Sequence, residues 1–437
     1  METNKKGLMH MPFAPIQEIL EGSYVNKRVA IRGWLYRQRE GKETIFLVVR
    51  DSTGFIQCTV KKESSAWNEA KKVTIESSLT LEGIAKQDKR APSGYEISVE
   101  KLSIIGLAEL FPIAKDKSEE FLRDVRHLWL RSRRMNLVMK VRSEVLRFTH
   151  EFFKKQEFFE VSPPMFITSA VEGGSTLFGL KYFDQNMYLT QSAQLYLEVL
   201  IYSLEKVYCV APSFRAEKSR TIRHLTEYWH IEAEQAFADM NDLMRLEEEL
   251  LTHVCHRAAA KCKREIEELG ADISKLTSVK TPFPRITYTE AIEKLHAKGF
   301  KIKWGEDLGY EEEKALADIF GKPFFVYDYP TLIRTFYCKT YRDNPKLAMS
   351  TDMLVPRIGE ISTGGAREDD KEKMIARIKE VGLKEEDYDW YIDLRRYGTV
   401  PHVGFGMGLE RLLTWMLDLE NIIDAIPFPR TIRRFYP

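Results

Sequence analysis

Alternating apolar and polar positions dominate the first quarter of the chain and predict a run of short strands. Five segments, each rich in β-branched or aromatic residues, are predicted as strands over 27–38, 43–54, 54–62, 77–86 and 95–106. A short helical stretch over 64–73 falls between the third strand and the fourth. Five strands with one helix after the third predict a small barrel of the OB type, whose second and third strands form a face that binds oligonucleotides.

The pattern changes to helical periodicity further along the chain. After a proline-led connection, apolar residues recur at spacings of three and four, which predicts a hinge over 111–135 and a helical entry into a larger domain over 136–437. A segment rich in Glu, Lys and Ala, followed by a proline cluster, predicts a helical insertion at about 241–280 that separates two halves of this domain. With the barrel domain over 1–110, two domains suit the 437 residues.

Composition and charge are those of a soluble protein with one local basic surface. Apolar residues make up 44% of the chain and charged residues 30%, enough for a full core and a polar surface. The 66 Lys and Arg nearly balance the 65 Asp and Glu, which excludes a generally basic nucleic-acid coat. Residues 27–62, however, hold nine Lys or Arg against three acids, so any polyanion is expected to meet this local patch.

The chain carries no signal of a membrane or secreted protein. No apolar run approaches the ~18 residues that a membrane span needs, and the first twelve residues lack the pattern of a signal peptide. The five cysteines are scattered and have no C-x-x-C spacing, which favours reduced thiols. We therefore expect a cytoplasmic protein without a membrane partner.

Phe46 and Gln57 are expected to stand on adjacent strands of the basic barrel face. An aromatic ring offers a stacking platform for a splayed base, and an amide can hydrogen-bond the edge of that base. The pattern equally allows Phe46 as barrel core and Gln57 as an ordinary outward polar residue. On the pattern alone both interpretations stay open.

Two later segments carry the residue types of a nucleotide site. Within 210–237, a strand leads to Arg215 and Glu217, and a second strand presents Tyr228. An Arg fork suits a phosphate, a carboxylate can hold a metal or an amine, and an aromatic ring can stack on a purine. A glycine-rich strand-to-helix corner then presents Arg411, whose guanidinium could cover the other face of the purine. Separately, each segment is a common structural device.

Together with residues 158–166, which end a long amphipathic helix and turn at Pro164, these segments resemble motifs 1, 2 and 3 of class II aminoacyl-tRNA synthetases. Neither a P-loop nor a dinucleotide fingerprint competes for the nucleotide. Within that class the chain is similar to the aspartyl and asparaginyl branch, and most similar to archaeal or eukaryotic asparaginyl members, in SAVEGGSTLF, YLTQSAQLYLEVL, FRAEKSRTIRHLTEYW, STDMLVPRIGEISTGGAREDD, YIDLRRYGTVPHVGFGMGLERLL and IPFPRT. The resemblance runs from about Lys27 to Arg430. It implies an α+β fold, in which an antiparallel sheet flanked by helices follows an N-terminal five-stranded OB-fold anticodon-binding barrel.

The resemblance assigns an ATP site residue by residue. The implied ATP-binding residues are Arg215, Glu217, His224, Tyr228, Glu360 and Arg411, with Arg215, Glu217 and Arg411 as the catalytic group. Arg215 is expected at the α-phosphate, and Tyr228 and Arg411 are expected on opposite faces of the adenine. Tyr228 stands where the family usually has Phe, which preserves stacking. The implied magnesium ligands are the carboxylates of Asp352 and Glu360.

The remaining implied residues bind the amino acid and the tRNA. For the amino acid they are Glu172, Gln194 and Glu232 around the α-ammonium, Arg367 at the side-chain oxygen, and Glu198. For the middle uracil of the anticodon they are Phe46, Gln57 and one of Arg37 or Arg39. Pro164 in motif 1 implies a homodimer. The run from 362 to 370 is a variant of the family's glycine-rich string, which leaves the nucleotide site intact.

Aspartate and asparagine are nearly isosteric, so charge must separate them. The aspartyl branch has a Lys three residues after the second Gln of its QSxQL motif, which is Gln194 in this chain; here that position is Leu197. The asparaginyl branch has a Glu four residues after the same Gln, and here this is Glu198. A carboxylate there would accept from an amide and repel the carboxylate of aspartate. The alternatives are a helix-surface role for Glu198 and a core role for Leu197.

The resemblance implies ATP-dependent ligation of L-asparagine to tRNA(Asn) through asparaginyl-adenylate, with release of AMP and pyrophosphate and with Mg²⁺ as cofactor. The nearest alternative is an aspartyl-tRNA synthetase, including a non-discriminating one, against which Leu197 and Glu198 argue. A tRNA-independent paralogue that makes asparagine would lack the barrel that residues 27–106 supply. A catalytically silent RNA-binding module is disfavoured by the intact motif residues.

Overall fold

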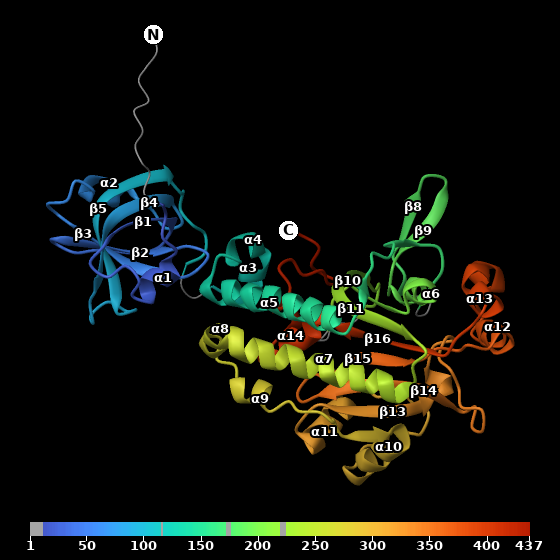
Figure 1. Ribbon diagram of the computed structural model, residues 1–437. Coiled ribbons are helices and arrows are strands. Elements are labelled where there is room, and N and C mark those ends of the chain that lie inside the picture. Colours follow the sequence, from blue (N-terminus) through green and yellow to red (C-terminus); the bar gives the residue numbers. More distant parts are fainter. Residues whose placement is uncertain (1–11, 115–116, 172–175, 219–223) are drawn as a thin grey trace. The chain divides into compact units, whose positions relative to one another are not determined.

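The computed structural model describes residues 12–114, 117–171, 176–218 and 224–437 of the chain (Figure 1). The described residues divide into two compact units, one that ends at Ser118 and one that runs from Glu119 to Pro437. The division falls inside the segment 111–135 that the sequence predicts as a hinge. Among the described residues, no helix combines the length and the apolar character needed to cross a membrane.

The first unit is a closed five-stranded barrel with strand order β1-β2-β3-β5-β4. Its elements are α1 (Ile16–Leu20), β1 (Arg28–Glu40), β2 (Thr44–Arg50), β3 (Phe55–Lys61), α2 (Trp67–Lys72), β4 (Ser78–Gln87) and β5 (Tyr95–Gly106). β3 and β5 pair in parallel and the other neighbours pair antiparallel. Because successive side chains of a strand point to opposite faces, about every second side chain of each strand packs in the barrel core. The predicted OB-type barrel, with a helix after the third strand, is confirmed.

The barrel core excludes both Phe46 and Gln57. On β2, Ile45 and Leu47 are fully buried, whereas Phe46 between them is half-buried on the outer face. Gln57 is likewise half-buried on β3, between the buried Ile56 and Cys58. The alternative in which Phe46 belongs to the core is therefore wrong.

The second unit is built on a mixed eight-stranded sheet of order β12-β13-β14-β15-β16-β11-β10-β6. These strands are β6 (Phe159–Glu160), β10 (Lys206–Phe214), β11 (Glu227–Ala236), β12 (Arg285–Thr287), β13 (Phe324–Pro330), β14 (Leu347–Val355), β15 (Gly359–Ala366) and β16 (His402–Gly408). All neighbours are antiparallel except β6 with β10 and β12 with β13. A small second sheet holds β7 (Phe166–Ile167), β8 (Gly179–Tyr182) and β9 (Gln185–Leu189).

Helices flank the large sheet, as the sequence predicts. They are α3 (Glu119–Asp124), α4 (Arg126–Trp129), α5 (Arg133–Lys155), α6 (Gln194–Leu204), α7 (Met240–Lys261), α8 (Lys263–Glu268), α9 (Ile273–Thr277), α10 (Tyr288–Ala297), α11 (Tyr310–Phe320), α12 (Lys371–Glu380), α13 (Asp389–Arg396) and α14 (Leu409–Met416), with short 3₁₀ turns at Thr331–Ile333, Glu385–Tyr388 and Ile422–Asp424. The long α5 and α7 run side by side (Figure 1). Their apolar faces share one core cluster with β11, β15 and β16, so α7 is part of the domain core.

Candidate active site

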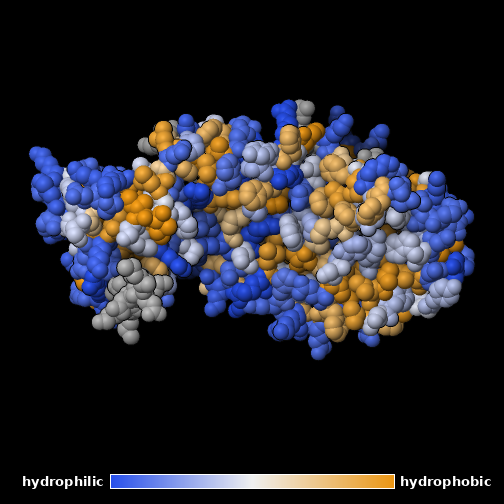
Figure 2. Space-filling model, turned by 90° about the horizontal axis from the view of Figure 1, so that it is seen from above, coloured by the Kyte–Doolittle hydropathy of each residue, from blue (hydrophilic) through white to orange (hydrophobic). Residues whose placement is uncertain are grey.

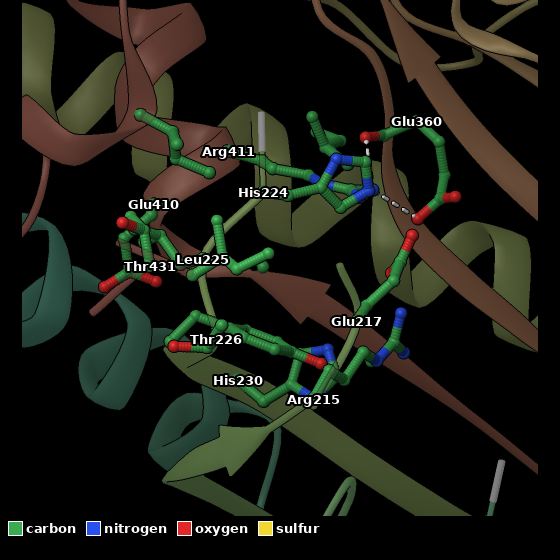
Figure 3. A pocket seen from close by; sticks show the side chains of 16 residues that line it. Arg215, Glu217, His224, Leu225, Thr226, His230, Glu360, Glu410, Arg411 and Thr431 are labelled. Atoms are coloured by element: carbon green, nitrogen blue, oxygen red, sulfur yellow. Dashed lines mark hydrogen bonds and ion pairs between the residues drawn. The ribbon is translucent and has the colours of Figure 1, made fainter. Parts of the chain in front are cut away.

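A hollow of about 670 Å³ opens where the β10–β11 hairpin, β15 and the β16–α14 corner meet (Figure 3). Its lining includes all six residues of the predicted ATP set, namely Arg215, Glu217, His224, Tyr228, Glu360 and Arg411. Arg215 and Glu217 follow β10 directly, and Tyr228 is the second residue of β11. The backbone N–H of Arg215 donates to the carbonyl of Thr226 at 3.0 Å, which extends the hairpin ladder to this point. Residues from three separate stretches of sequence thus meet in one pocket.

Charged and aromatic groups of this hollow contact one another in pairs. Nη1 of Arg411 donates to the side chain of Glu360 at 2.8 Å and to its carbonyl at 3.1 Å. The Arg215 guanidinium lies 5.7 Å from the ring centre of Tyr228. The Tyr228 ring also meets His230 edge-on, with ring centres 4.9 Å apart. An arginine beside an aromatic ring and a second arginine held by a carboxylate are the groups that a nucleotide requires.

His230 lies in the floor of the hollow and is neutral near pH 7. Burial lowers its pKa to about 3, with further lowering by the charges of Arg215 and Arg411. Its Nδ1 lies 3.1 Å from Oγ of Ser213 on the neighbouring strand. A neutral His230 therefore adds no positive charge to that of Arg215 and Arg411.

A second cavity of about 1040 Å³ adjoins the first and shares Arg215, His230 and Glu360 with it. Three predicted amino-acid-binding residues, Gln194, Glu232 and Arg367, lie in its wall, together with Glu234. The carboxylate of Glu232 accepts from Oγ of Ser192 and, at 2.9 Å, from the backbone N–H of Ala193. The two cavities form adjoining halves of one site.

Arg367 and Glu234 form a buried ion pair in the second cavity. Nε of Arg367 donates to both oxygens of Glu234, at 3.1 and 3.3 Å, and Nη2 donates to Oε1 at 2.5 Å. Burial raises the pKa of Glu234 to about 7, against the opposing charge of Arg367. Gly404 on β16 makes room for this pair, because a Cβ there would lie 2.0 Å from Cδ of Glu234. The alternating glycines of the sequence therefore permit a charged pair beside the cavity.

Glu198 does not line the cavity, contrary to the expectation that its carboxylate meets the substrate. It is fully buried on α6, one turn beyond Gln194. Its Oε1 accepts from Nε2 of Gln194 at 3.0 Å. Its Oε2 accepts from the hydroxyl of Tyr391 at 2.7 Å and from Nη2 of Arg395 at 2.8 Å, and it lies 3.0 Å from Nε2 of His402. It therefore reaches the cavity only through its partners.

Electrostatics keep Glu198 ionised in this buried position. Burial alone would raise its pKa, but the charge of Arg395 and the contact with His402 hold the pKa well below its usual range. The neighbouring Leu197 is fully buried in an apolar cluster with Val207 and Cys209. Leu197 thus has the core role that the sequence left open.

Asp352 and Glu360, the two predicted magnesium ligands, lie on the neighbouring strands β14 and β15, where Asp352 pairs with Thr363 and Glu360 pairs with Leu354. Oδ2 of Asp352 accepts from Nη2 of Arg334 at 2.6 Å, and the Tyr329 hydroxyl also donates a hydrogen bond to this carboxyl. Burial raises the pKa of Asp352, opposed by Arg334 and reinforced by Glu360. Mg²⁺ commonly takes one or two carboxylates and completes its shell with waters and substrate phosphates. Glu360 lines the nucleotide hollow and Asp352 lies on the next strand, and two carboxylates suit that donor set.

The other predicted residues lie elsewhere or outside the described chain. Glu172 falls outside the described residues. Arg37, Arg39, Phe46 and Gln57 lie together in a groove of about 1460 Å³ on the barrel. Pro164 lies at the surface beyond β6. The sequence motifs do not predict Arg334, which lines the second cavity, because no pattern around it in the sequence indicates a functional residue.

Comparison with known proteins gives one family match for each of the two units of the chain. Residues 118–432 match the family described as tRNA synthetases class II (D, K and N), and residues 29–105 match the OB-fold nucleic acid binding domain. The chain is 51% identical over 415 residues to the asparagine–tRNA ligase of Thermococcus kodakarensis, covering 94% of this chain and 96% of that protein. It is 46% identical over 426 residues to the asparagine–tRNA ligase of Thermoplasma acidophilum, covering 97% and 99%.

A solved structure agrees over nearly the whole chain. Asparaginyl-tRNA synthetase from Pyrococcus horikoshii, complexed with asparaginyl-adenylate, superimposes with a TM-score of 0.94 at 47% identity and covers 98% of this chain and 100% of that one. The fold, the two adjoining cavities and these matches together place the chain among the class II tRNA synthetases. Within that class, it belongs to the asparagine–tRNA ligase family.

Proposed function

We propose that this protein ligates L-asparagine to tRNA(Asn) at the expense of ATP, through an asparaginyl-adenylate intermediate. The observation that carries the proposal is a polar cavity for an amino acid that adjoins a nucleotide hollow and shares Arg215 and Glu360 with it. An adenylate needs both halves at once, because it joins an amino acid to AMP. A relative at 47% identity was solved with this intermediate bound.

The nucleotide half supplies stacking and positive charge. Tyr228 and Arg411 would enclose the adenine from opposite faces, and Arg215 would contact the α-phosphate. Glu217 and His224, in the same lining, would complete this half. The ion pair of Arg411 with Glu360 supports the arrangement, since it fixes the guanidinium at the edge of the hollow.

The carboxylates of Asp352 and Glu360 would hold Mg²⁺ beside the phosphates. Bound there, the ion would neutralise charge that develops on the phosphate oxygens during transfer. The placement of the two carboxylates supports this assignment, because Glu360 lines the nucleotide hollow and Asp352 lies on the neighbouring strand.

The amino-acid half favours a neutral side chain over a charged one. Nε and Nη2 of Arg367 already donate to Glu234, so the positive charge of Arg367 is largely balanced inside the protein. Arg367 lines the cavity, and its remaining nitrogen, Nη1, would donate to a substrate side-chain oxygen. A carboxylate substrate would bring a second negative charge beside Glu234, and a buried charge without a partner costs several kcal/mol.

Glu198 would act on the substrate through Gln194. A carboxylate only accepts hydrogen bonds, so the group of Gln194 that faces Glu198 must be its NH₂. The carbonyl oxygen of Gln194 is thereby left for the cavity, where it can accept from an ammonium or an amide. Glu232 and Glu172 would complete the surroundings of the α-ammonium.

The chemistry requires alignment more than acid–base catalysis. The substrate carboxylate is itself the nucleophile, so the residues of the site orient it towards the α-phosphate, while Arg215 stabilises the charge that develops there. Pyrophosphate leaves and asparaginyl-adenylate forms. A hydroxyl of the terminal adenosine of the tRNA then attacks the activated carbonyl, which yields asparaginyl-tRNA and releases AMP.

The barrel would select the tRNA. Phe46 lies on the outer face of β2, where a base can stack on it, and the Arg39 guanidinium lies 5.6 Å from its ring centre. With Gln57 and Arg37 in the same groove, these groups would read the middle uracil of the anticodon. We further propose a homodimer formed through motif 1 around Pro164, and a cytoplasmic location.

ATP–pyrophosphate exchange tests this function directly. The purified protein is assayed with asparagine and with aspartate at equal concentrations, and we expect exchange with asparagine alone. Charging of a tRNA(Asn) transcript with labelled asparagine is the second readout. Exchange with aspartate would reassign the chain: to an aspartyl enzyme if a tRNA is charged with aspartate, and to an asparagine-forming paralogue if no tRNA is charged.

A further inference from the structure

A partly buried hydrogen bond with Glu96 on the barrel fixes the orientation of the Gln57 side chain. Gln57 on β3 and Glu96 on β5 are direct partners across the parallel pair of strands. Nε2 of Gln57 donates to Oε2 of Glu96 at 3.0 Å. The second oxygen of Glu96 accepts from Oγ1 of Thr59 at 3.3 Å, and Thr59 is buried. Both carboxylate oxygens therefore have a donor, which holds Glu96 in place beside Gln57.

The identity of the group that Gln57 presents to the groove follows from the chemistry of Glu96. An ionised carboxylate has acceptors and no donor, so the amide of Gln57 must turn its NH₂ towards Glu96. The carbonyl Oε1 is then directed away from Glu96. Both residues line the groove that also holds Arg37, Arg39 and Phe46. The groove thus combines an oriented acceptor with two arginine donors.

This combination distinguishes the two pyrimidines. The Watson–Crick edge of uracil has an N3–H donor between two carbonyl acceptors, which match an acceptor flanked by arginines. Cytosine has an unprotonated N3 and an amino donor on the same edge, so its N3 would face the carbonyl of Gln57 with two acceptors opposed. A glutamine free to turn could accommodate either base, whereas one held by Glu96 cannot.

We propose that Glu96 is a specificity-determining positioning residue, which makes the groove prefer uracil over cytosine by fixing the Gln57 amide. The inference rests on the proposed anticodon-reading role of this groove and extends it to a residue outside the reading set. Glu96 itself is not expected to contact the middle base.

The test compares tRNA transcripts with U or C at the middle anticodon position. The full-length protein and its Glu96→Gln variant are assayed for kcat/KM of aminoacylation with each transcript. For the wild type we expect kcat/KM to be about 10- to 100-fold higher with the U transcript than with the C transcript, the scale of one good base contact. In E96Q the new amide can face Gln57 with either its oxygen or its NH₂, so Gln57 can turn and the preference should fall below about fivefold. Much of this fall should come from a rise with the C transcript, which a merely structural defect would not produce.

Two further variants separate this route from others. Gln57→Leu removes the acceptor, and adding E96Q to it should change the U/C ratio no further, because Glu96 acts through Gln57. Glu82→Gln removes another barrel carboxylate, one that pairs with Arg28 outside the groove, and should leave the ratio as in the wild type. Exchange of ATP and pyrophosphate, which needs only the second unit, should be normal in Glu82→Gln, and in the other variants it reports whether the second unit is intact.

Three results would overturn the proposal. E96Q could raise kcat/KM equally for both transcripts, which would mean that Glu96 only repels phosphate. It could change the preference at a flanking anticodon position instead, which would mean that Glu96 reads that base directly. A wild-type protein without any U/C preference would instead remove the proposed anticodon-reading role of the groove, whatever E96Q does.

Discussion

At the scale of single residues, Arg215 has the sharpest expected role. It is the cation shared by both cavities, so it can meet the α-phosphate where amino acid and nucleotide join. Arg215→Ala should lower ATP–pyrophosphate exchange with asparagine by about 10²–10³-fold, the usual effect of removing a group that stabilises transition-state charge. Arg342→Ala, an exposed arginine outside both cavities, is the matched control and should keep wild-type exchange. Near-normal exchange by Arg215→Ala would contradict the role of Arg215 at the α-phosphate.

Glu198 allows a second prediction at this scale. Glu198→Gln keeps the shape but removes the charge that orients Gln194 and pairs with Arg395. We expect kcat/KM for asparagine to fall by about tenfold or more and the asparagine-over-aspartate ratio to fall with it, because the Gln194 amide can then turn. KM for ATP should stay near the wild-type value, since Glu198 lies away from the nucleotide hollow. An unchanged asparagine/aspartate ratio, measured by exchange in a folded variant, would contradict this role.

At the scale of elements, the sequence predicts what depends on near neighbours and misses what depends on distant ones. The barrel strands follow from local alternation, and the ATP residues follow from motifs that sit at the ends of strands. The depth of Glu198 could not be read from α6, because its burial depends on Tyr391 and Arg395 of α13 and on His402 of β16, about two hundred residues away. No local pattern encodes such a contact.

The packing of α7 on the sheet carries a pH-dependent prediction. Glu247 on α7 is fully buried and accepts from Oγ of Ser362 on β15 at 2.5 Å. Burial raises the pKa of Glu247 to about 8 from an ordinary 4.5, partly opposed by Ser362. The folded state therefore binds this proton more tightly than the unfolded state. The stability contributed by the neutral form is complete below about pH 4.5 and is lost as the pH rises to about 8.

Glu247→Gln should remove this dependence. The variant keeps an acceptor for Ser362 but cannot ionise, so between pH 5 and 8 the wild type should lose up to a few kcal/mol of unfolding free energy relative to the variant. Denaturant unfolding at several pH values measures the difference. Glu249→Gln, on the same helix but only half-buried, is the control and should parallel the wild type. Parallel pH profiles for wild type and Glu247→Gln would contradict the prediction.

At the scale of the whole molecule, the two units divide recognition from chemistry. Each has its own core, the barrel around its inward-facing strand residues and the larger unit around α5, α7 and the sheet. The groove with Phe46 and Gln57 belongs entirely to the first unit, and both cavities belong entirely to the second. A substitution in one unit is therefore expected to separate tRNA selection from adenylate formation.

The proposed homodimer rests on an exposed apolar surface in motif 1. Figure 2 shows apolar residues at the surface among polar ones, and the exposed hydrophobic residues of the chain include Phe159 (55% exposed), Met165 (47%) and Phe166 (47%). Phe159 lies on β6, an edge strand of the large sheet, which pairs with β10 and with no other strand of the described part of the chain. An exposed sheet edge with apolar side chains is a favourable surface for a second chain.

Phe159→Glu tests the dimer without touching either cavity. A charge in the centre of a desolvated interface is strongly unfavourable, so the variant should sediment as a 50.9 kDa monomer at concentrations where the wild type has twice that mass. Leu332→Glu, which places the same charge at an exposed leucine away from motif 1, should stay dimeric. Analytical ultracentrifugation over a concentration series distinguishes the two. A wild type that stays monomeric at micromolar concentration, or a Phe159→Glu variant that stays dimeric, would show that motif 1 is not the interface.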